Sequence, residues 1–219
     1  MSVGIRSVFA PWRLCAKYFS APRALNDYAT HIPILIGLAR LREVRSVLEF
    51  GCGHYSTLTF LNASAFPHLE RLHSIENDDT WAQTVQEAAG NDFRWRLQLV
   101  EGDISGWVAH LDLESFDLIL IDDSKTSEQR AATIRAVAAK APKHPWTVIH
   151  DFEFEEYRRA ASGFQHRHRS RAYNPETGVV GNRIDEWKTV DRVIRSKAKL
   201  LEPDAVAQWI DSFSHDVQN

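Results

Sequence analysis

The fold is decided by one stretch, which runs from Val47 to Thr57 and reads VLEFGCGHYST. Its apolar first half predicts a short strand over residues 46–50. Gly51 then allows a sharp turn and leaves no side chain between the backbone and a ligand. Ser56 or Thr57 stands at the start of a predicted helix, where a hydroxyl can cap the helix and unpaired N–H groups point over the loop. The stretch therefore predicts a turn that holds a ligand.

The charge of that ligand is indicated by Glu49, at the end of the predicted strand. A carboxylate there would repel a diphosphate and attract an ammonium group. This favours a cationic ligand that carries an amino acid over a dinucleotide. A Gly-X-Gly turn after a strand also occurs by chance in many folds, so the interpretation depends on the rest of the chain.

A second acid follows at a suitable distance. Residues 71–76 read as a second strand that ends in Glu76, about 25 residues after Gly51. In a strand-helix-strand unit, a carboxylate at this place can accept hydrogen bonds from the two ribose hydroxyls of a nucleoside that lies across the first loop.

The next two predicted strands also end in acids. Residues 95–100 are followed by Glu-Gly-Asp, which ends at Asp103, and residues 116–121 are followed by Asp122 and Asp123. In open parallel sheets the ligand binds at this carboxyl edge. The pattern predicts one acidic edge that serves one ligand.

Strands and helices alternate along the chain, which predicts a parallel sheet with helices on both faces. The last two strands, 167–173 and 178–183, are joined by too few residues for a helical crossover and should form an antiparallel hairpin. We therefore predict an α/β fold: a doubly wound, mostly parallel, Rossmann-like sheet of about seven strands. The other predicted elements are strands 46–50, 71–76, 95–100, 116–121 and 146–150, and helices 26–41 (interrupted at Pro33), 56–63, 79–89, 127–140 and 153–162.

These motifs together resemble the class I S-adenosylmethionine-dependent methyltransferases, over about Ser46 to Asn182. In that family the first loop and its acid face the methionine part of the cofactor. The acid after the second strand binds the ribose, and the residue matched by Asp103 contacts the adenine amino group. Asp122 matches the position near the sulfonium and the acceptor. The family loop often has a third glycine where this chain has Tyr55.

The resemblance implies that S-adenosyl-L-methionine is the cofactor. Within the loop, the side chains of His54 and Tyr55 are candidates for ligand contact. The predicted cofactor-binding residues are Glu49, Gly51, Gly53, His54, Tyr55, Ser56, Glu76, Asp103 and Asp122.

A second group of residues concerns the chemistry. Asp122 ends the fourth predicted strand, and His150 and Asp151 end the fifth, so their side chains can converge. They could bind a divalent metal such as Mg, or His150 could act alone as a general base. The arrangement partly resembles metal-dependent small-molecule O-methyltransferases, although Phe152 stands where that family has Asn. Alternatively, His150 and Asp151 cap the helix that begins near Phe154.

Length and composition agree with one enzyme-sized domain. With 219 residues, of which 44% are hydrophobic, the chain can bury a full core. The formal net charge of -3 argues against general nucleic-acid binding. Cys15 and Cys52 are too few for a disulfide scaffold and suggest a reducing, cytoplasmic location. No apolar stretch is long enough to predict a membrane span.

The ends of the chain are predicted to cover this domain. Residues 1–45 form an N-terminal arm and helix over the pocket, although the Arg-rich, acid-poor first 23 residues also suit an organelle-targeting segment or a membrane-surface helix. Residues 46–184 form the cofactor-binding domain, and helices in 185–219 pack on it or make the seam of a homodimer. The basic run 166–171 fits a solvated edge strand better than a site for an anionic acceptor.

The sequence thus predicts an S-adenosylmethionine-dependent methyltransferase that acts on a small molecule, at a hydroxyl oxygen. One alternative is a nicotinamide-dependent oxidoreductase, although Ser56 stands where the dinucleotide fingerprint needs its last glycine. Another is a methyltransferase-like protein without catalysis, which serves as a binding or assembly partner.

Overall fold

The structure is a computed structural model, and it describes residues 27–123, 126–171 and 173–183. The predicted arm before residue 27 and the predicted helices after residue 184 lie outside these ranges.

Within these ranges, seven strands and seven helices or helical turns carry the fold, together with three further short 3-10 turns. The strands are β1 (Ser46–Phe50), β2 (Arg71–Glu76), β3 (Trp95–Leu99), β4 (Leu118–Ile121), β5 (Trp146–Ile149), β6 (His166–Ser170) and β7 (Thr177–Gly181). The helices are η1 (Asp27–Ala29), α2 (Ile32–Leu41), α3 (Ser56–Leu61), α4 (Asp79–Ala89), α5 (Ile104–Trp107), α6 (Ser127–Lys140) and α7 (Glu155–Ala160). The 3-10 turns are η2 (Val108–His110), η3 (Leu113–Ser115) and η4 (Ala161–Gly163).

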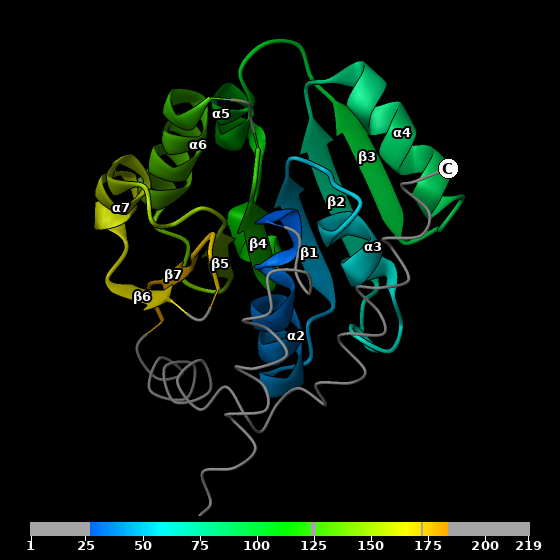
Figure 1. Cartoon of the computed structure of the whole chain (residues 1–219), viewed down its shortest axis with the longest axis horizontal. Coiled ribbons are helices and arrows are strands. Elements are labelled where there is room, and N and C mark those ends of the chain that lie inside the picture. The colour runs from blue at the N-terminus through cyan, green and yellow to red at the C-terminus, as the bar shows by residue number, and fades with distance from the viewer. Residues whose placement is uncertain (1–26, 124–125, 172, 184–219) are drawn as a thin grey trace, which may run out of the picture.

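All strands form one sheet in the order β3-β2-β1-β4-β5-β7-β6 (Figure 1). The first five strands in this order are parallel, and β7 is antiparallel to both β5 and β6. The predicted fold class is confirmed, including the antiparallel hairpin at the edge. Strand order reverses between β1 and β4, and in such sheets a ligand binds outside the carboxyl ends of the strands at that point.

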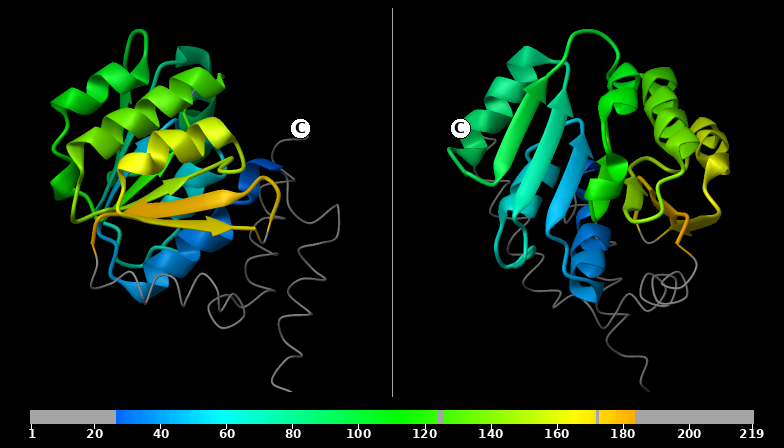
Figure 2. Two further views of the ribbon diagram at one scale, coloured as in Figure 1. Left: turned by 90° about the vertical axis from the view of Figure 1, so that its left-hand side faces the viewer. Right: turned by 180° about the vertical axis from the view of Figure 1, so that it is seen from behind.

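Helices cover both faces of the sheet (Figure 2). On one face, α2 and α3 bury residues such as Leu35 and Phe60 against Val47 and Leu118. On the other face, α5, α6 and α7 bury residues such as Ile134 against the remaining side chains of the same strands. The two cores follow from the alternation of side chains along each strand.

Several predicted boundaries shift for local reasons. Pro33 opens α2 rather than interrupting it, because a helix tolerates proline in its first turn. β4 begins at Leu118 rather than 116, since Phe116 closes a 3-10 turn and the Asp117 carboxylate accepts hydrogen bonds from the N–H groups of Arg45 and Ser46.

Other boundaries differ by a few residues. The connection between β3 and β4, for which no regular structure was predicted, holds α5 and two 3-10 turns. The hairpin strands β6 and β7 begin one residue earlier and end two or three residues earlier than predicted.

Gly51, directly after β1, lies against the backbone that follows β4. Its φ is +84°, a conformation that side chains rarely adopt. A Cβ atom there would lie 2.6 Å from the carbonyl oxygen of Asp122 and 2.7 Å from the Cα of Asp123. The turn after β1 can therefore reach the end of β4 only if residue 51 is glycine.

Within the described ranges, no helix has the length and apolar character needed to cross a membrane.

We predict that Gly51→Ala lowers the free energy of unfolding by about 3 kcal/mol or more, because a positive φ and a backbone clash act together. Gly102→Ala is the matched control: its φ is +78°, but a Cβ there meets nothing within 4 Å. It should cost only about 1–2 kcal/mol. Chemical denaturation of both variants measures the difference. Equal losses would show that the close approach is not tight.

Candidate active site

The loop after β1 is organised around the Thr57 hydroxyl. This group accepts a hydrogen bond from the N–H of Gly53 (3.0 Å) and donates one to Glu49 Oε2 (2.8 Å). The helix α3 starts at Ser56 and has no side-chain cap, so the predicted hydroxyl cap is wrong. The Thr57 hydroxyl instead donates its hydrogen bond to the buried carboxylate of Glu49.

Glu49 is fully buried on β1. Besides Thr57, Ser74 donates a hydrogen bond to its Oε2 at 2.5 Å. Burial raises the pKa of Glu49 to about 7, although these hydroxyl groups oppose the shift. The acid lies at the predicted place, inside the floor of the loop rather than on its surface.

Glu76 lies at the end of β2 and ties the first loop to the second strand. Its Oε2 accepts a hydrogen bond from the N–H of Cys52 (3.1 Å), and its Oε1 accepts from Asn77 and Asp78 (2.8 and 3.0 Å). The Cys52 thiol lies 3.7 Å from Oε2. A carboxylate has about four acceptor positions, so one remains that is filled only by a weak thiol donor.

Aromatic side chains lie beside this loop. The Trp81 indole N–H on α4 donates to the carbonyl of Cys52 (2.6 Å), and the ring meets His54 edge-on at 5.3 Å between centroids. Trp81 is 41% exposed and Tyr55 is half-buried. His54 thus packs against a partly exposed tryptophan at the rim of the loop, and burial lowers its pKa.

Asp103 follows β3 and is exposed at the same edge of the sheet. Its Oδ1 caps α5 by accepting a hydrogen bond from the N–H of Ser105 (3.1 Å). The short helix α5 was not predicted from the sequence, and it gives this acid a structural partner in addition to the predicted adenine contact.

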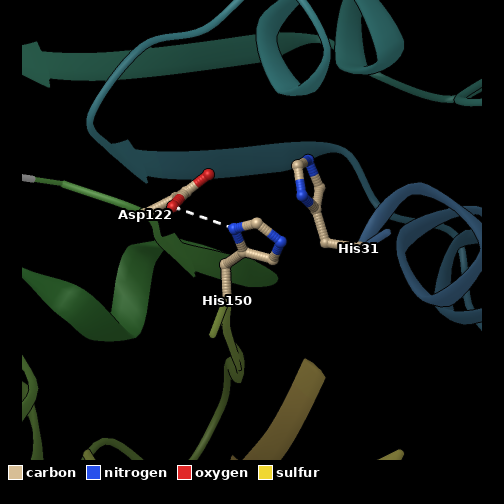
Figure 3. Close-up of side chains that lie close together, drawn as sticks. All are labelled: His31, Asp122 and His150. Atoms are coloured by element: carbon tan, nitrogen blue, oxygen red, sulfur yellow. Dashed lines mark hydrogen bonds and ion pairs between the residues drawn. The ribbon is translucent and has the colours of Figure 1, made fainter. Parts of the chain in front are cut away.

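Asp122 and His150 meet as the sequence predicts, after β4 and β5. Their Oδ1 and Nδ1 atoms are 3.2 Å apart (Figure 3). Burial alone would lower the pKa of His150, but the nearby Asp122 carboxylate raises it. Burial alone would raise the pKa of Asp122, but His150 and Arg130 hold it below its ordinary value.

Asp151 lies beside this pair, with its Oδ1 3.7 Å from His150 Nδ1, and it also pairs with Arg130, which sequence reasoning missed. The Arg130 guanidinium contacts Asp151 Oδ2 (2.6 Å), Asp122 Oδ1 (3.0 Å) and the carbonyl oxygen of Asp123 (2.7 Å). Arg130 is only 8% exposed, in the first turns of α6. One buried cation therefore joins the ends of β4 and β5. An arginine in a helix that directly follows two aspartates was the available signal.

The alternative in which His150 and Asp151 cap the next helix is wrong. α7 has Phe154 at its N-cap, with no side-chain hydrogen bond. Phe152 is buried with its ring against Gly178, so it supplies no ligand in place of the family's Asn. Asp151 itself adopts a positive φ of 57°.

His31 is the second residue that sequence reasoning missed. It precedes α2, is 1% exposed, and meets the His150 ring at 4.8 Å between centroids. Thr30 beside it has its Oγ1 3.0 Å from His150 Nε2. Burial, followed by the charge of His150, lowers the pKa of His31 to about 3. No motif marks residue 31, because its contact with residue 150 arises only from the packing of α2 on the sheet.

Comparison with known proteins identifies the central part of the chain. Residues 48–152 match the family model described as a methyltransferase domain. This segment is a methyltransferase domain. It spans the carboxyl edge from β1 to the residues after β5, including Gly51, Asp122 and His150.

Solved structures share the fold of this methyltransferase domain at low sequence identity. A spermidine synthase in complex with the transition-state analogue AdoDATO has a TM-score of 0.54 at 16% identity, over 84% of this chain and 73% of that one. A provisionally assigned caffeoyl-CoA O-methyltransferase from Staphylococcus aureus has a TM-score of 0.52 at 14% identity (80% and 91%). A provisionally assigned O-methyltransferase from Nostoc punctiforme has a TM-score of 0.51 at 15% identity (82% and 64%). No curated protein matches the chain.

We predict that Glu49→Gln removes a pH-dependent loss of stability. The folded protein holds the Glu49 proton more tightly than the unfolded chain, so this stabilisation is complete below about pH 4.5 and is lost as the pH rises through about 7. The free energy of unfolding of Glu49→Gln should therefore gain about 3 kcal/mol relative to the native protein between these limits.

Denaturation of both proteins across this range measures the gain, and taking the difference cancels the other titrating groups. Glu87→Gln, at an exposed position on α4, is the control and should show no such gain. A difference between Glu49→Gln and the native protein that does not vary with pH would contradict the assignment.

Proposed function

We propose that this methyltransferase domain uses S-adenosyl-L-methionine to methylate a small molecule at a hydroxyl oxygen. The family match supports methyl transfer. Two of the structures with the same fold are provisionally assigned O-methyltransferases, which favours oxygen as the methylated atom.

The observation that carries the proposal is the arrangement of acids along the carboxyl edge. Glu49 is the last residue but one of β1 and Glu76 ends β2, while Asp103 and Asp122 follow β3 and β4. Such an edge repels the diphosphate of a dinucleotide and suits a ligand with a sulfonium and an ammonium group. We therefore rank a nicotinamide-dependent oxidoreductase below a methyltransferase.

The residues of the edge fit a methionine nucleoside. Gly51 keeps the turn clear of side-chain atoms, and the Glu76 acceptor position that is filled only by the Cys52 thiol suits one ribose hydroxyl. Three backbone N–H groups already use this carboxylate. We therefore expect one ribose hydroxyl, not two, to bond to Glu76, and it would do so by displacing the Cys52 thiol. Asp103 and the loop residues His54, Tyr55 and Ser56 complete the proposed cofactor site.

Asp122, His150 and Asp151 are proposed to act on the acceptor. In the reaction the acceptor oxygen forms a bond to the methyl carbon, the carbon–sulfur bond breaks with its electron pair going to sulfur, and the acceptor loses one proton. A neutral alcohol is a weak nucleophile, so the site must help to remove that proton. Either His150 takes it as a general base, or a bound metal lowers the pKa of the hydroxyl.

Arg130 fixes the positions of both carboxylates in this proposal. It holds Asp151 beside the pair without a direct role in methyl transfer, and we assign Arg130 as a positioning residue.

The segment before β1 belongs to the site in this proposal. Thr30 and His31 precede α2 and contact or adjoin His150, so the chain N-terminal to residue 46 reaches the acceptor side. The division into an N-terminal arm (1–45), a cofactor domain (46–184) and C-terminal helices (185–219) is part of the proposal. A cytoplasmic location and a homodimer remain part of the same proposal.

We predict that S-adenosylmethionine and S-adenosylhomocysteine stabilise the protein, whereas NAD does not. At a hundredfold excess over the dissociation constant, linkage gives about 2.7 kcal/mol, or roughly 5–10 °C in Tm for a domain of this size. Thermal unfolding with each ligand measures the shift. Stabilisation by NAD alone would overturn the proposed cofactor.

We predict that Glu76→Ala weakens binding of S-adenosylhomocysteine by roughly 1.5–3 kcal/mol, because a ribose hydroxyl loses a charged acceptor and the loop loses its anchor at the Cys52 N–H. Glu87→Ala removes the same charge from the exposed side of α4 and should bind normally. Calorimetry on variants shown to be folded gives both affinities. Unchanged affinity in Glu76→Ala would remove this residue from the site.

A further inference from the structure

The cluster formed by His31, Asp122 and His150 brings together three elements far apart in the sequence. His31 precedes α2, Asp122 follows β4 and His150 follows β5. One possible ligand atom from each lies within 4.8 Å of the other two. Among the residues that the structure describes, this is the one group of three or more His, Cys, Asp or Glu side chains with such geometry. Figure 3 shows the two rings and the carboxylate facing one another.

The buried side chain of His31 indicates that the cluster lacks a bound ligand. Within the described ranges, neither ring nitrogen of His31 has a hydrogen-bond partner, although the side chain is 1% exposed. Polar groups are rarely buried without a partner, and each exception calls for an explanation such as an absent ion. A ligand placed between His31 and the other two residues would supply that partner.

His150 is oriented as a metal ligand would be. Its Nε2 lies 3.0 Å from the Thr30 hydroxyl, which leaves Nδ1 facing Asp122. Histidines that bind metals usually donate their other ring N–H to a fixed acceptor, which sets the tautomer and the ring orientation. A metal ion would bind Nδ1 on the side of the ring that faces Asp122.

Asp122 keeps one oxygen for such an ion. Arg130 and His150 both contact Oδ1. In Figure 3 the other oxygen points away from His150, toward the side of His31. Arg130 also pairs with Asp151. The two carboxylates and the one guanidinium therefore leave one net negative charge beside the two imidazoles.

We infer that His31, Asp122 and His150 bind a divalent transition-metal ion such as Zn²⁺, Mn²⁺ or Fe²⁺ rather than Mg²⁺. Two imidazole nitrogens and one carboxylate oxygen suit these metals, whereas Mg²⁺ prefers oxygen ligands. Ligand atoms bound at about 2.0–2.2 Å lie roughly 3–3.5 Å apart, so side-chain movements of about 1 Å close the site. Three protein ligands leave coordination positions open for an acceptor oxygen.

This assignment replaces Asp151 by His31 in the predicted ligand set and replaces Mg²⁺ as the predicted metal. Its catalytic meaning rests on the proposed function, because an acceptor oxygen on the metal would lose its proton more readily. Metal binding itself needs no S-adenosylmethionine and is therefore measured without it.

The test uses the full chain without an affinity tag, stripped of metal by a chelator. Titration with Co²⁺, followed by visible absorption, should show one bound ion per chain with ligand-field bands, and Zn²⁺ should displace it. Mg²⁺ in large excess should leave the bands unchanged. Calorimetry with Zn²⁺ gives the affinity.

His31→Leu is the decisive variant because it keeps much of the volume of the side chain and removes both unpartnered nitrogens. It should weaken Zn²⁺ binding by roughly 10²-fold or more, while the metal-free variant melts at the same temperature as the native protein or higher. Thr30→Val leaves the three ligands in place and should weaken binding by 10–100-fold. His68→Ala removes an exposed imidazole elsewhere and should bind as the native protein does.

Three results would overturn the inference: no binding of Co²⁺ or Zn²⁺, the same Zn²⁺ affinity in His31→Leu as in the native protein, or binding of Mg²⁺ that depends on Asp151. Should His31→Leu fail to fold, the Thr30→Val affinity decides in its place. A protein that binds no metal could still bind S-adenosylmethionine, so this result would not contradict the proposed cofactor. A protein that binds no S-adenosylmethionine could still be titrated with metal, so the two proposals can fail separately.

Discussion

The structure depends on the close approach of two backbone segments at the point where the strand order reverses. Gly51 begins the turn after β1 and lies against the carbonyl of Asp122 after β4, and no side chain fits between them. This contact brings the loop that follows β1 and the acid that follows β4 to one place. The proposed cofactor and acceptor sites are therefore neighbours because of one steric constraint, and every other group at the edge is arranged around it.

Ionisable side chains are buried at this edge at a cost to the free energy of folding. Glu49 is buried in a setting that raises its pKa, and Arg130 is buried to pair with two carboxylates. Buried ionic groups of this kind often stabilise a protein less than well-packed apolar groups would, which makes them weak candidates for a purely structural role. Their position at the switch point of the sheet fits a site built for ligand chemistry rather than for stability. Arg130 bridges the carboxylates of Asp122 and Asp151, and His150 lies against the same two carboxylates.

The sequence predicted what local pattern controls. Apolar runs and turn residues predicted strand β1 and helix α4. They also predicted the acids Glu49 and Glu76 near the carboxyl ends of β1 and β2. The convergence of Asp122 with His150 followed from their places on neighbouring strands. His31 could not be predicted, because its contact with His150 depends on how α2 packs across the sheet. The pairing of Asp151 was likewise beyond the pattern, since its carboxylate contacts the buried Arg130 of α6.

A crystal structure of the protein grown with S-adenosylhomocysteine would show directly whether this edge binds the methyl donor. The nucleoside should lie across the carboxyl ends of β1 and β2, with a ribose hydroxyl on Glu76 and the sulfur turned toward Asp122. The turn at Gly51 should pass beneath the ligand without moving. A nucleoside bound away from this edge, or no bound nucleoside at saturating concentration, would contradict the assignment of the edge as a methyl-donor site.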